Sequence, residues 1–280
     1  MLWVDTIADL RGQVGRWRNE GQRIALVPTM GNLHEGHLAL LIKARDEADR
    51  IIVSVFVNPT QFVAGEDYDE YPRTPGQDRE KLAACRADLV FQPGVDEIYP
   101  GGFAGRTSVT VPALDSIFCG TFRPGHFTGV ATVVCKLLNI VQPDCAIFGE
   151  KDYQQLLVVR HLAADLCLPI RIIGVPTVRE KDGLALSSRN GYLSAGEREV
   201  APRLYQVLCT AAEKIKRGDR DYDVIEKNAD EALRNAGFRT EYLAVRNAGD
   251  LGIPGDDDLV ILAAAWLGKA RLIDNIIIRR

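Results

Sequence analysis

His34 and His37 lie three residues apart in the stretch PTMGNLHEGHLAL, where an apolar run gives way to an amphipathic one. Imidazoles donate hydrogen bonds and exchange protons near neutral pH. If a helix begins here, the two rings share one face, beside the unpaired N–H groups of the first turn. Such a helix start attracts phosphate. We therefore expect a site that binds a nucleoside triphosphate and stabilises charge on a phosphorus under attack.

Two glycines accompany the histidines, Gly31 at the end of the apolar run and Gly36 between the rings. Both allow a ribose or base to approach the backbone closely. The stretch matches neither the P-loop pattern nor G-x-G-x-x-G, so those nucleotide sites are not indicated. Two alternatives stay open. One is a metal pair, although H-E-x-x-H places its histidines four residues apart, and the other is a purely structural role.

A second polar stretch, GEKDYQQ, follows the apolar run CAIFG. Lys151 supplies a mobile cation for phosphate, and Asp152 can accept ribose hydroxyls or organise water around a metal. Gln155 shares a helical face with Lys151 if the helix has begun. The alternative is a solvated, charged helix start.

A third stretch, KDGLALSSRNGYLS, brings Ser187, Ser188 and Arg189 together in a loop. Two hydroxyls and a guanidinium can close over a triphosphate and neutralise the departing pyrophosphate. The alternative is a polar loop followed by a helix cap.

The stretch NPTQF contributes Asn58 and Gln61, neutral amides suited to a hydroxylated or carboxylated small molecule. Asn-Pro alone is more often a turn. The stretches YPRT and RPGHF contain Arg73, Arg123 and His126, for which we expect structural roles.

These stretches follow short apolar runs that alternate with amphipathic ones. The strand-like runs are RIALVPTM, IIVSVFVN, DLVFQP, CAIFG and IRIIGVPTV, and the helix-like runs are HLALLIKARDEAD, the segment 77–87, VATVVCKLLNIV and YQQLLVVRHLAADL. This alternation predicts the α/β class, with a Rossmann-like, doubly wound parallel sheet. Ligands bind outside the carboxyl ends of such strands, so PTMG, NPTQF and FGEKD should meet there.

The pattern changes after about residue 176. SAGE predicts a capping box with Ser194 as N-cap and Glu197 three residues on, before a helical region to about Lys216 that Pro202 kinks or restarts. A helix over 222–235 and three strand-like runs, EYLAVRN, LVILAAAWL and ARLIDNIIIRR, follow. We predict a binding domain over 1–176. A smaller α+β domain over 177–280, with a three-stranded antiparallel sheet, is predicted to form a lid.

Composition excludes several classes of protein. Hydrophobic residues make up 46% and charged residues 26%, an ordinary folded balance, and the net charge of -4 gives no footprint for nonspecific nucleic-acid binding. The six cysteines contain no C-x-x-C pair, so we expect buried thiols and no zinc site. Neither a signal peptide nor a bilayer-spanning run is present, and we expect a soluble, cytoplasmic protein with no membrane partner.

Taken in order, these motifs resemble the pantoate–β-alanine ligase (pantothenate synthetase) family of the H-x-G-H nucleotidyltransferase superfamily, over about residues 2–279. The resemblance rests on VPTMGNLHEGH, VFVNPTQF, YPRT, RPGHF, VQPD, FGEKDYQQL, DGLALSSRNGYLS and AAWLGKARLIDN. H-x-G-H alone is shared with cytidylyltransferases, adenylyltransferases and class I aminoacyl-tRNA synthetases, whereas the ordered set is specific.

The resemblance implies that ATP, (R)-pantoate and β-alanine give pantothenate, AMP and pyrophosphate through pantoyl adenylate. It implies catalytic roles for His34, His37, Lys151, Ser187, Ser188 and Arg189, with His37 as proton donor. The implied ATP site comprises Met30, Gly31, Asn32, Leu33, His34, Glu35, Gly36, His37, Gly149, Glu150, Lys151, Asp152, Val178, Leu186, Ser187, Ser188 and Arg189. Asn58, Gln61 and Gln155 would hold pantoate and β-alanine, and Asp78 would act indirectly through water.

The resemblance also implies Mg²⁺ bound with ATP, without assigned protein ligands, and a homodimer. Where the family usually has a methionine beside pantoate, this sequence has Thr60, which alters the pocket wall but leaves Gln61 in place. Three other functions are weighed. They are another H-x-G-H nucleotidyltransferase whose product keeps the nucleotide, a class I tRNA synthetase, disfavoured by length and acidic charge, and a nucleotide-binding module without catalysis.

Overall fold

The computed structural model describes residues 1–63 and 65–280. In chain order its elements are β1 (Leu2–Val4), α1 (Ile7–Asn19), β2 (Ile24–Thr29), α2 (Glu35–Glu47), β3 (Arg50–Val55), η1 (Pro59–Gln61), α3 (Pro75–Ala84), β4 (Leu89–Phe91), α4 (Val95–Ile98), α5 (Pro112–Asp115), α6 (Cys119–Phe122), α7 (His126–Val141), β5 (Cys145–Gly149), η2 (Glu150–Asp152), α8 (Tyr153–Asp165), β6 (Arg171–Val175), η3 (Ser188–Tyr192), α9 (Ala195–Val200), α10 (Arg203–Lys216), α11 (Tyr222–Asn235), β7 (Arg239–Asn247), β8 (Leu259–Leu267) and β9 (Ala270–Ile278).

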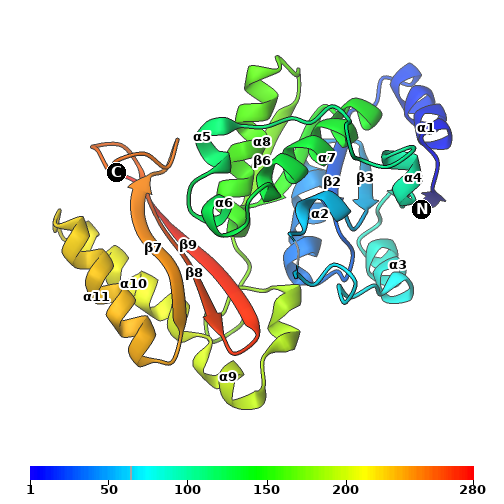
Figure 1. Ribbon diagram of the computed structural model, residues 1–280. Coiled ribbons are helices and arrows are strands. Elements are labelled where there is room, and N and C mark those ends of the chain that lie inside the picture. Colours follow the sequence, from blue (N-terminus) through cyan, green and yellow to red (C-terminus); the bar gives the residue numbers. More distant parts are fainter. Residues whose placement is uncertain (64) are drawn as a thin grey trace. The chain divides into compact units, whose positions relative to one another are not determined.

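The chain divides into two compact units. The larger contains Met1–Glu150 and Gln155–Pro176, and the smaller contains Lys151–Gln154 and Thr177–Arg280. In Figure 1 the larger unit runs from blue to green, and the smaller runs mainly through yellow to red. The domain boundaries 1–176 and 177–280, and the lid role of the second domain, stay predictions.

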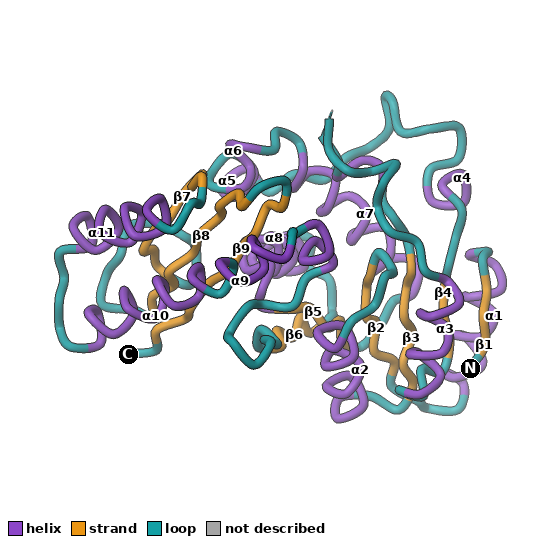
Figure 2. Tube along the Cα trace, turned by 90° about the horizontal axis from the view of Figure 1, so that it is seen from below, coloured by secondary structure: helices purple, strands orange, loops and turns teal. Residues whose placement is uncertain are grey.

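The larger unit is built on a six-stranded sheet in the order β1-β4-β3-β2-β5-β6, and every described pairing is parallel. Figure 2 shows β2, β3, β4 and β1 side by side. The strand that follows β2 in the chain, β3, lies on one side of the β2–β5 pair, and the strand that follows β5, β6, lies on the other side. The order therefore reverses between β2 and β5, and ligands bind at such switch points. The H-x-G-H and GEKD stretches both leave the sheet there.

Helices cover both faces of this sheet. Ala25 and Val27 of β2 pack with Leu41 of α2 in one buried cluster. Leu26, which points to the opposite face, is also fully buried. Burial on both faces explains why these strands read as continuous apolar runs, and the predicted doubly wound parallel sheet is confirmed.

The smaller unit holds the predicted antiparallel sheet, in the order β7-β8-β9. Leu208 of α10 and Leu233 of α11 pack with Ile261 of β8 in its core. The predicted capping box is present at Ser194, and the helical region ends and restarts around Pro202 as expected.

Several elements differ from the prediction. Helix α7 begins at His126 instead of residue 130, because Gly125 adopts the left-handed conformation (φ 81°) at its N-cap. Helix α3 begins at Pro75 instead of residue 77, since proline suits the first helical position. The elements β1, α1 and α4–α6 have no predicted counterpart. Most of them are too short to show a period, and Gly12 and Gly15 weaken the helical signal of α1.

The cysteines are all free thiols. Cys119 and Cys145 are buried, but Cys167 is exposed, so the expectation of buried thiols is wrong for Cys167. Among the described residues, no helix combines the length and apolar character needed to cross a bilayer.

Candidate active site

The H-x-G-H motif forms the turn from β2 into α2. His34 is the N-cap of α2, and its Nδ1 accepts the N–H of Gly36 at 3.2 Å. Nδ1 of His37 accepts the N–H of His34 at 3.3 Å, which completes a reciprocal capping box. The ring centroids are 4.1 Å apart, so both rings lie over the first turn as their spacing predicts.

These hydrogen bonds decide which ring nitrogen carries the proton. Because Nδ1 accepts in both rings, the proton of each neutral imidazole lies on Nε2. His34 and His37 therefore present Nε2–H donors at a helix N-terminus, where the helix dipole already favours an anion. Both side chains are half-buried, which leaves them accessible to a ligand.

A buried carboxylate from α3 holds the loop that precedes His34. Asp78 is 2% exposed, and its Oδ2 accepts the N–H of Asn32 at 2.9 Å while its Oδ1 accepts that of Leu33 at 2.8 Å. Nζ of Lys81 donates to the carbonyl of Leu33 at 2.5 Å. Helix α3 thereby fixes the backbone on which the two histidines are mounted.

Gly31 is required by this same contact. Its φ is +84°, and a Cβ there would lie 3.1 Å from Oδ2 of Asp78 and 3.2 Å from Cγ1 of Val55. A left-handed backbone and a close neighbour both disfavour a larger residue. A contact within the protein therefore explains why position 31 is a glycine, whereas the sequence had suggested the close approach of a ligand.

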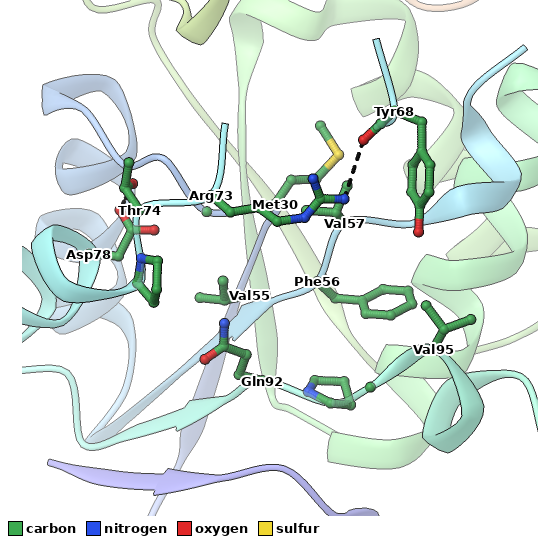
Figure 3. Close-up of a pocket in the computed structure, with 14 residues that line it drawn as sticks. Met30, Val55, Phe56, Val57, Tyr68, Arg73, Thr74, Asp78, Gln92 and Val95 are labelled. Atoms are coloured by element: carbon green, nitrogen blue, oxygen red, sulfur yellow. Dashed lines mark hydrogen bonds between the residues drawn. The ribbon is translucent and has the colours of Figure 1, made fainter. Parts of the chain in front are cut away.

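A pocket of about 310 Å³ opens at the carboxyl ends of β2, β3 and β4 (Figure 3). Met30 follows β2, Phe56 follows β3 and the segment 92–95 follows β4, while Thr74 and Asp78 line the pocket from the start of α3. Its volume suits a small molecule. The pocket lies at the sheet edge where the sequence predicts ligand binding.

Arg73 also lines this pocket, but its guanidinium is engaged by the backbone of its own loop. It donates to the carbonyls of Tyr68 at 3.3 Å, Asp69 at 3.2 Å and Tyr71 at 3.1 Å. These contacts agree with the structural role expected for Arg73.

Gln61 lies at the end of η1, and its amide is held from two sides. Nε2 lies 3.1 Å from Sδ of Met30, and Oε1 accepts from Nδ2 of Asn58 at 3.1 Å. Because Met30 lines the pocket, the amide of Gln61 adjoins it.

Asn58 is 1% exposed, and its polar atoms contact protein. Oδ1 accepts from the hydroxyls of Tyr99 at 2.9 Å and Thr60 at 3.0 Å, and Nδ2 also donates to the carbonyl of Gly129 at 3.2 Å. Burial raises the pKa of the Tyr99 phenol. These contacts make Asn58 a support for Gln61, and direct contact between Asn58 and substrate stays a prediction. A methionine in place of Thr60 would have no hydroxyl for this network.

In the smaller unit, Lys151 and Asp152 lie in η2, half-buried. Nδ2 of Asn275 on β9 donates to the carbonyl of Lys151 at 3.0 Å, which fixes the backbone under the lysine. Gln155 is half-buried in the first turn of α8, and this residue belongs to the larger unit.

The SSRN stretch leads into the short 3-10 helix η3 of the smaller unit. Oγ of Ser187 caps η3 by accepting the N–H of Arg189 at 3.2 Å. The N–H of Leu186 donates to the carbonyl of Val178 at 3.0 Å, so these two predicted ATP-binding residues lie opposite one another in a short hairpin. Ser187, Ser188 and Arg189 are each half-buried.

Within residues 1–63 and 65–280, no group of three or more His, Cys, Asp and Glu side chains is placed to hold a metal ion. The metal-pair alternative for His34 and His37 has no third ligand of these types in the described residues.

Comparison with known proteins decides the family. A family model described as pantoate-beta-alanine ligase matches residues 2–277. The chain is 55% identical over 278 residues to the pantothenate synthetase of Azotobacter vinelandii, covering 99% of this chain and 98% of that protein. The chain belongs to the pantoate–β-alanine ligase family.

Solved structures of pantoate–β-alanine ligases agree with this assignment. The pantothenate synthetase of Thermus thermophilus superposes with a TM-score of 0.92 at 47% identity, covering 99% of each chain. The pantoate-beta-alanine ligase of Francisella tularensis, solved in complex with beta-gamma ATP and beta-alanine, gives 0.78 at 36% identity, covering 99% of this chain and 97% of that one.

The predicted residues of the H-x-G-H loop, Met30 to His37, form one continuous turn in the larger unit. Sequence reasoning missed the supports of that turn, Asp78 and Lys81, and the supports of Gln61, Tyr99 and Gly129. No local signal marks them, because each contacts a segment far away in the chain. Of these residues only Asp78 was predicted to take part in the site, and the role predicted for it was indirect, through water.

Proposed function

We propose that this chain condenses (R)-pantoate with β-alanine at the expense of ATP, giving pantothenate, AMP and pyrophosphate. In the first step a pantoate carboxylate oxygen attacks the α-phosphorus and pyrophosphate leaves, which forms pantoyl adenylate. In the second, the β-alanine nitrogen attacks the acyl carbon, the bond to AMP breaks and the amine loses a proton. The whole-chain family match carries this proposal, and the paired Nε2–H donors of His34 and His37 supply its chemistry.

The residues proposed to bind the nucleotide are those that the family resemblance implies. They are Met30–His37, Gly149–Asp152, Val178 and Leu186–Arg189. The Nε2–H groups of the histidines donate to phosphate oxygens and stabilise the negative charge that grows during in-line attack. His37 is the donor that the family resemblance singles out; as a neutral imidazole it stabilises this charge through its Nε2–H hydrogen bond and keeps the proton. Lys151 and Arg189 neutralise the departing pyrophosphate.

Gln61 and Gln155 hold pantoate in this proposal, and Gln61 also contacts β-alanine. A rigid amide orients the carboxylate toward the α-phosphorus, and positioning of this kind supplies a large part of the rate in group transfer. The contacts of Met30 and Asn58 with the two ends of the Gln61 amide support this role.

Mg²⁺ accompanies ATP in the proposal. In the proposal the cation is held mainly by phosphate oxygens and water. When bound it neutralises phosphate charge, and neither step of the reaction depends on a protein ligand to it. The proposal further includes a cytoplasmic homodimer in which the smaller domain covers the site as a lid.

A pyrophosphate-exchange assay tests the function. The protein is mixed with ATP, Mg²⁺ and pantoate, and exchange of labelled pyrophosphate into ATP is followed. β-Alanine is then added, and AMP and pantothenate are measured. Exchange that does not depend on pantoate would contradict the proposal and would favour another H-x-G-H nucleotidyltransferase.

A His37→Ala variant tests the proposed donor. It removes the Nε2–H group, and loss of one oriented donor typically lowers kcat by about 10²–10³-fold. The variant should keep the far-ultraviolet spectrum of the wild type. Full activity in a folded His37→Ala protein would remove His37 from the mechanism.

A further inference from the structure

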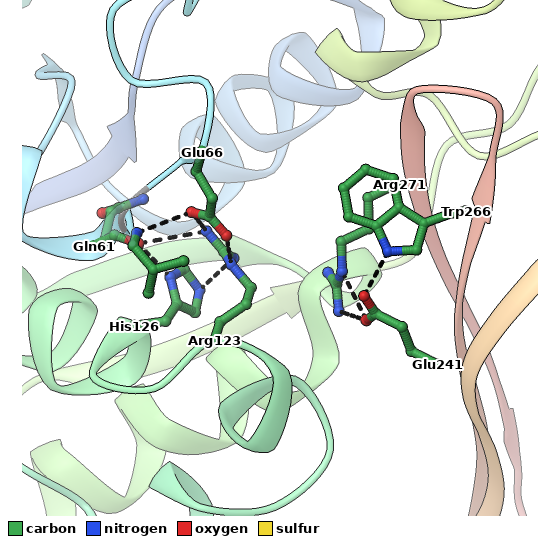
Figure 4. Close-up of polar contacts among 8 residues, drawn as sticks. Gln61, Glu66, Arg123, His126, Glu241, Trp266 and Arg271 are labelled. Carbon is green, nitrogen blue, oxygen red and sulfur yellow. Dashed lines mark hydrogen bonds and ion pairs between the residues drawn. The ribbon is translucent and has the colours of Figure 1, made fainter.

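A cluster of polar side chains holds the main-chain carbonyl of Gln61, whereas Asn58 contacts its side chain. It comprises Glu66, Arg123 and His126, all in the larger unit, and Figure 4 shows it converging on Gln61. Nε and Nη2 of Arg123 donate to the two carboxylate oxygens of Glu66 at 2.5 and 2.6 Å. The side chains of Arg123 and Glu66 are 12% and 21% exposed, so this bidentate pair is largely removed from water.

His126 continues the cluster to Gln61. Nη1 of Arg123 lies 3.0 Å from Nε2 of His126, and Nδ1 of His126 lies 2.7 Å from the carbonyl oxygen of Gln61. Nη2 of Arg123 reaches the same carbonyl at 3.4 Å. His126 itself is 7% exposed, at the start of α7.

The two ends of this contact fix the tautomer of His126. An arginine can only donate, so Nε2 must accept, and a carbonyl can only accept, so Nδ1 must carry the proton. His126 is therefore neutral and has the opposite tautomer to His34 and His37. The Glu66–Arg123 ion pair orients the imidazole, and the imidazole in turn orients the carbonyl group of Gln61.

We propose that Glu66, Arg123 and His126 are positioning residues for the acid substrate, acting through the main chain of Gln61. The proposal rests on the proposed function, in which the Gln61 amide holds pantoate. Asn58 fixes the side chain of Gln61 and His126 fixes its carbonyl, so the residue is held at both ends. A displacement of about 1 Å at a substrate-positioning group can cost about 10²-fold in rate. Loss of the cluster should therefore act on pantoate and not on ATP.

Two substitutions at His126 separate this role from a general structural one. In His126→Asn the amide nitrogen takes the place of Nδ1 and can still donate to the Gln61 carbonyl. In His126→Gln the amide lies near the place of Nε2, so the donor to Gln61 is lost while the contact with Arg123 can persist. Glu66→Gln and Arg123→Lys weaken the ion pair that orients His126.

The matched control is a second buried Arg–Glu pair, Arg271 with Glu241, drawn in Figure 4. It lies in the smaller unit, Nη2 of Arg271 donates to Oε2 of Glu241 at 2.8 Å, and the side chains are 12% and 10% exposed. Glu241→Gln makes the same chemical change as Glu66→Gln in a comparable environment, within the unit that does not contain Gln61. It reports what the loss of such a pair does to stability alone.

The measurements are KM for pantoate, KM for ATP and kcat in pantoate-dependent pyrophosphate exchange, with thermal unfolding of each variant. We expect His126→Gln, Glu66→Gln and Arg123→Lys to raise KM for pantoate about 10-fold or more while KM for ATP changes less than about twofold, one tenfold change being about 1.4 kcal/mol. His126→Asn should retain most of the wild-type affinity, and Glu241→Gln should leave both KM values unchanged.

Equal KM values for pantoate in His126→Gln and His126→Asn would overturn the proposal, as would parallel increases for ATP and pantoate. Unfolding temperatures that fall equally in Glu66→Gln and Glu241→Gln, with neither KM changed, would reduce the cluster to a stabilising ion pair. The proposed function fails separately, if the wild-type protein shows no pantoate-dependent exchange.

Discussion

At the scale of single residues, the two histidines of the H-x-G-H motif each serve two purposes. In each ring Nδ1 accepts a hydrogen bond that caps α2, and this leaves Nε2 as the nitrogen that carries the proton. Cap and donor are therefore the same residue. The spacing that places the rings over one turn was readable from the sequence, because capping is a local interaction.

Asp78 provides a test at this scale. In Asp78→Asn one acceptor oxygen becomes an NH₂ group that faces a backbone N–H of the loop, either that of Asn32 or that of Leu33. Leaving a buried donor unsatisfied costs about 1–3 kcal/mol, so we expect a lower unfolding free energy and a raised KM for ATP.

Glu80, exposed on the same helix, supplies the control, since Glu80→Gln changes the charge equally at a solvent-exposed position. Denaturant unfolding and initial-rate kinetics on the pair measure both effects. If Asp78→Asn is as stable and as active as Glu80→Gln, the carboxylate does not hold the loop.

At the scale of elements, α7 packs closely on η1 in the larger unit. A Cβ on Gly129 would lie 2.2 Å from the carbonyl oxygen of Thr60 and 2.8 Å from Cα of Gln61. Only glycine lets the helix pack directly on the segment that holds the Gln61 amide.

This packing predicts opposite effects for one substitution at two sites. Gly129→Ala should force α7 and η1 apart, lower stability by about 1–3 kcal/mol and raise KM for pantoate. Gly12→Ala in α1, where a Cβ would meet nothing within 4 Å, should instead raise stability by about 0.5–1 kcal/mol through helix propensity. Urea unfolding of both variants checks the signs. A neutral or stabilising Gly129→Ala would show that the two elements can separate without cost.

Elements differ in how well the sequence predicts them, for physical reasons. The strands of the central sheet were predicted because burial on both faces leaves a continuous apolar run in each. The start of α7 was not, because the residues of RPGHF read as a loop and the left-handed Gly125 that begins the helix has no periodic signal. Strand β1 has no counterpart because Leu2–Val4 is too short to show alternation.

At the scale of the whole molecule, the site depends on contacts between segments distant in the chain. Asp78 reaches Asn32, and Arg123 reaches Glu66, only because the sheet topology brings their elements together. The identities of these partners could not be derived from residue spacing. The motifs predicted the chemical groups, and the strand order determines which other residues support them.

The dependence of stability on pH belongs to this scale, and Tyr99 contributes to it. Burial raises its pKa above the ordinary value of 10.0, so the folded state favours the neutral phenol. This contribution is fully present below the unfolded pKa near 10 and is lost as the pH rises through the folded pKa.

Tyr99→Phe lacks both the hydroxyl that donates to Asn58 and the titration. It should therefore be less stable than the wild type near pH 8, and the difference should shrink as the pH rises above about 10. Urea unfolding of both proteins at a series of alkaline pH values measures this difference. A gap that stays constant or widens with pH would contradict the raised pKa.

Because Lys151–Gln154 belong to the smaller unit, no single cut in the chain separates the two units. The segment follows β5 and precedes the rest of α8, both of the larger unit, yet Tyr153 donates to the carbonyl of Ala248 at 2.8 Å and Lys151 is held by Asn275. A fragment cut after residue 176 would keep these residues but lose their partners. The two units are therefore not interchangeable modules joined by one linker, and a recombination that replaced residues 177–280 would also have to match a segment encoded upstream of the junction.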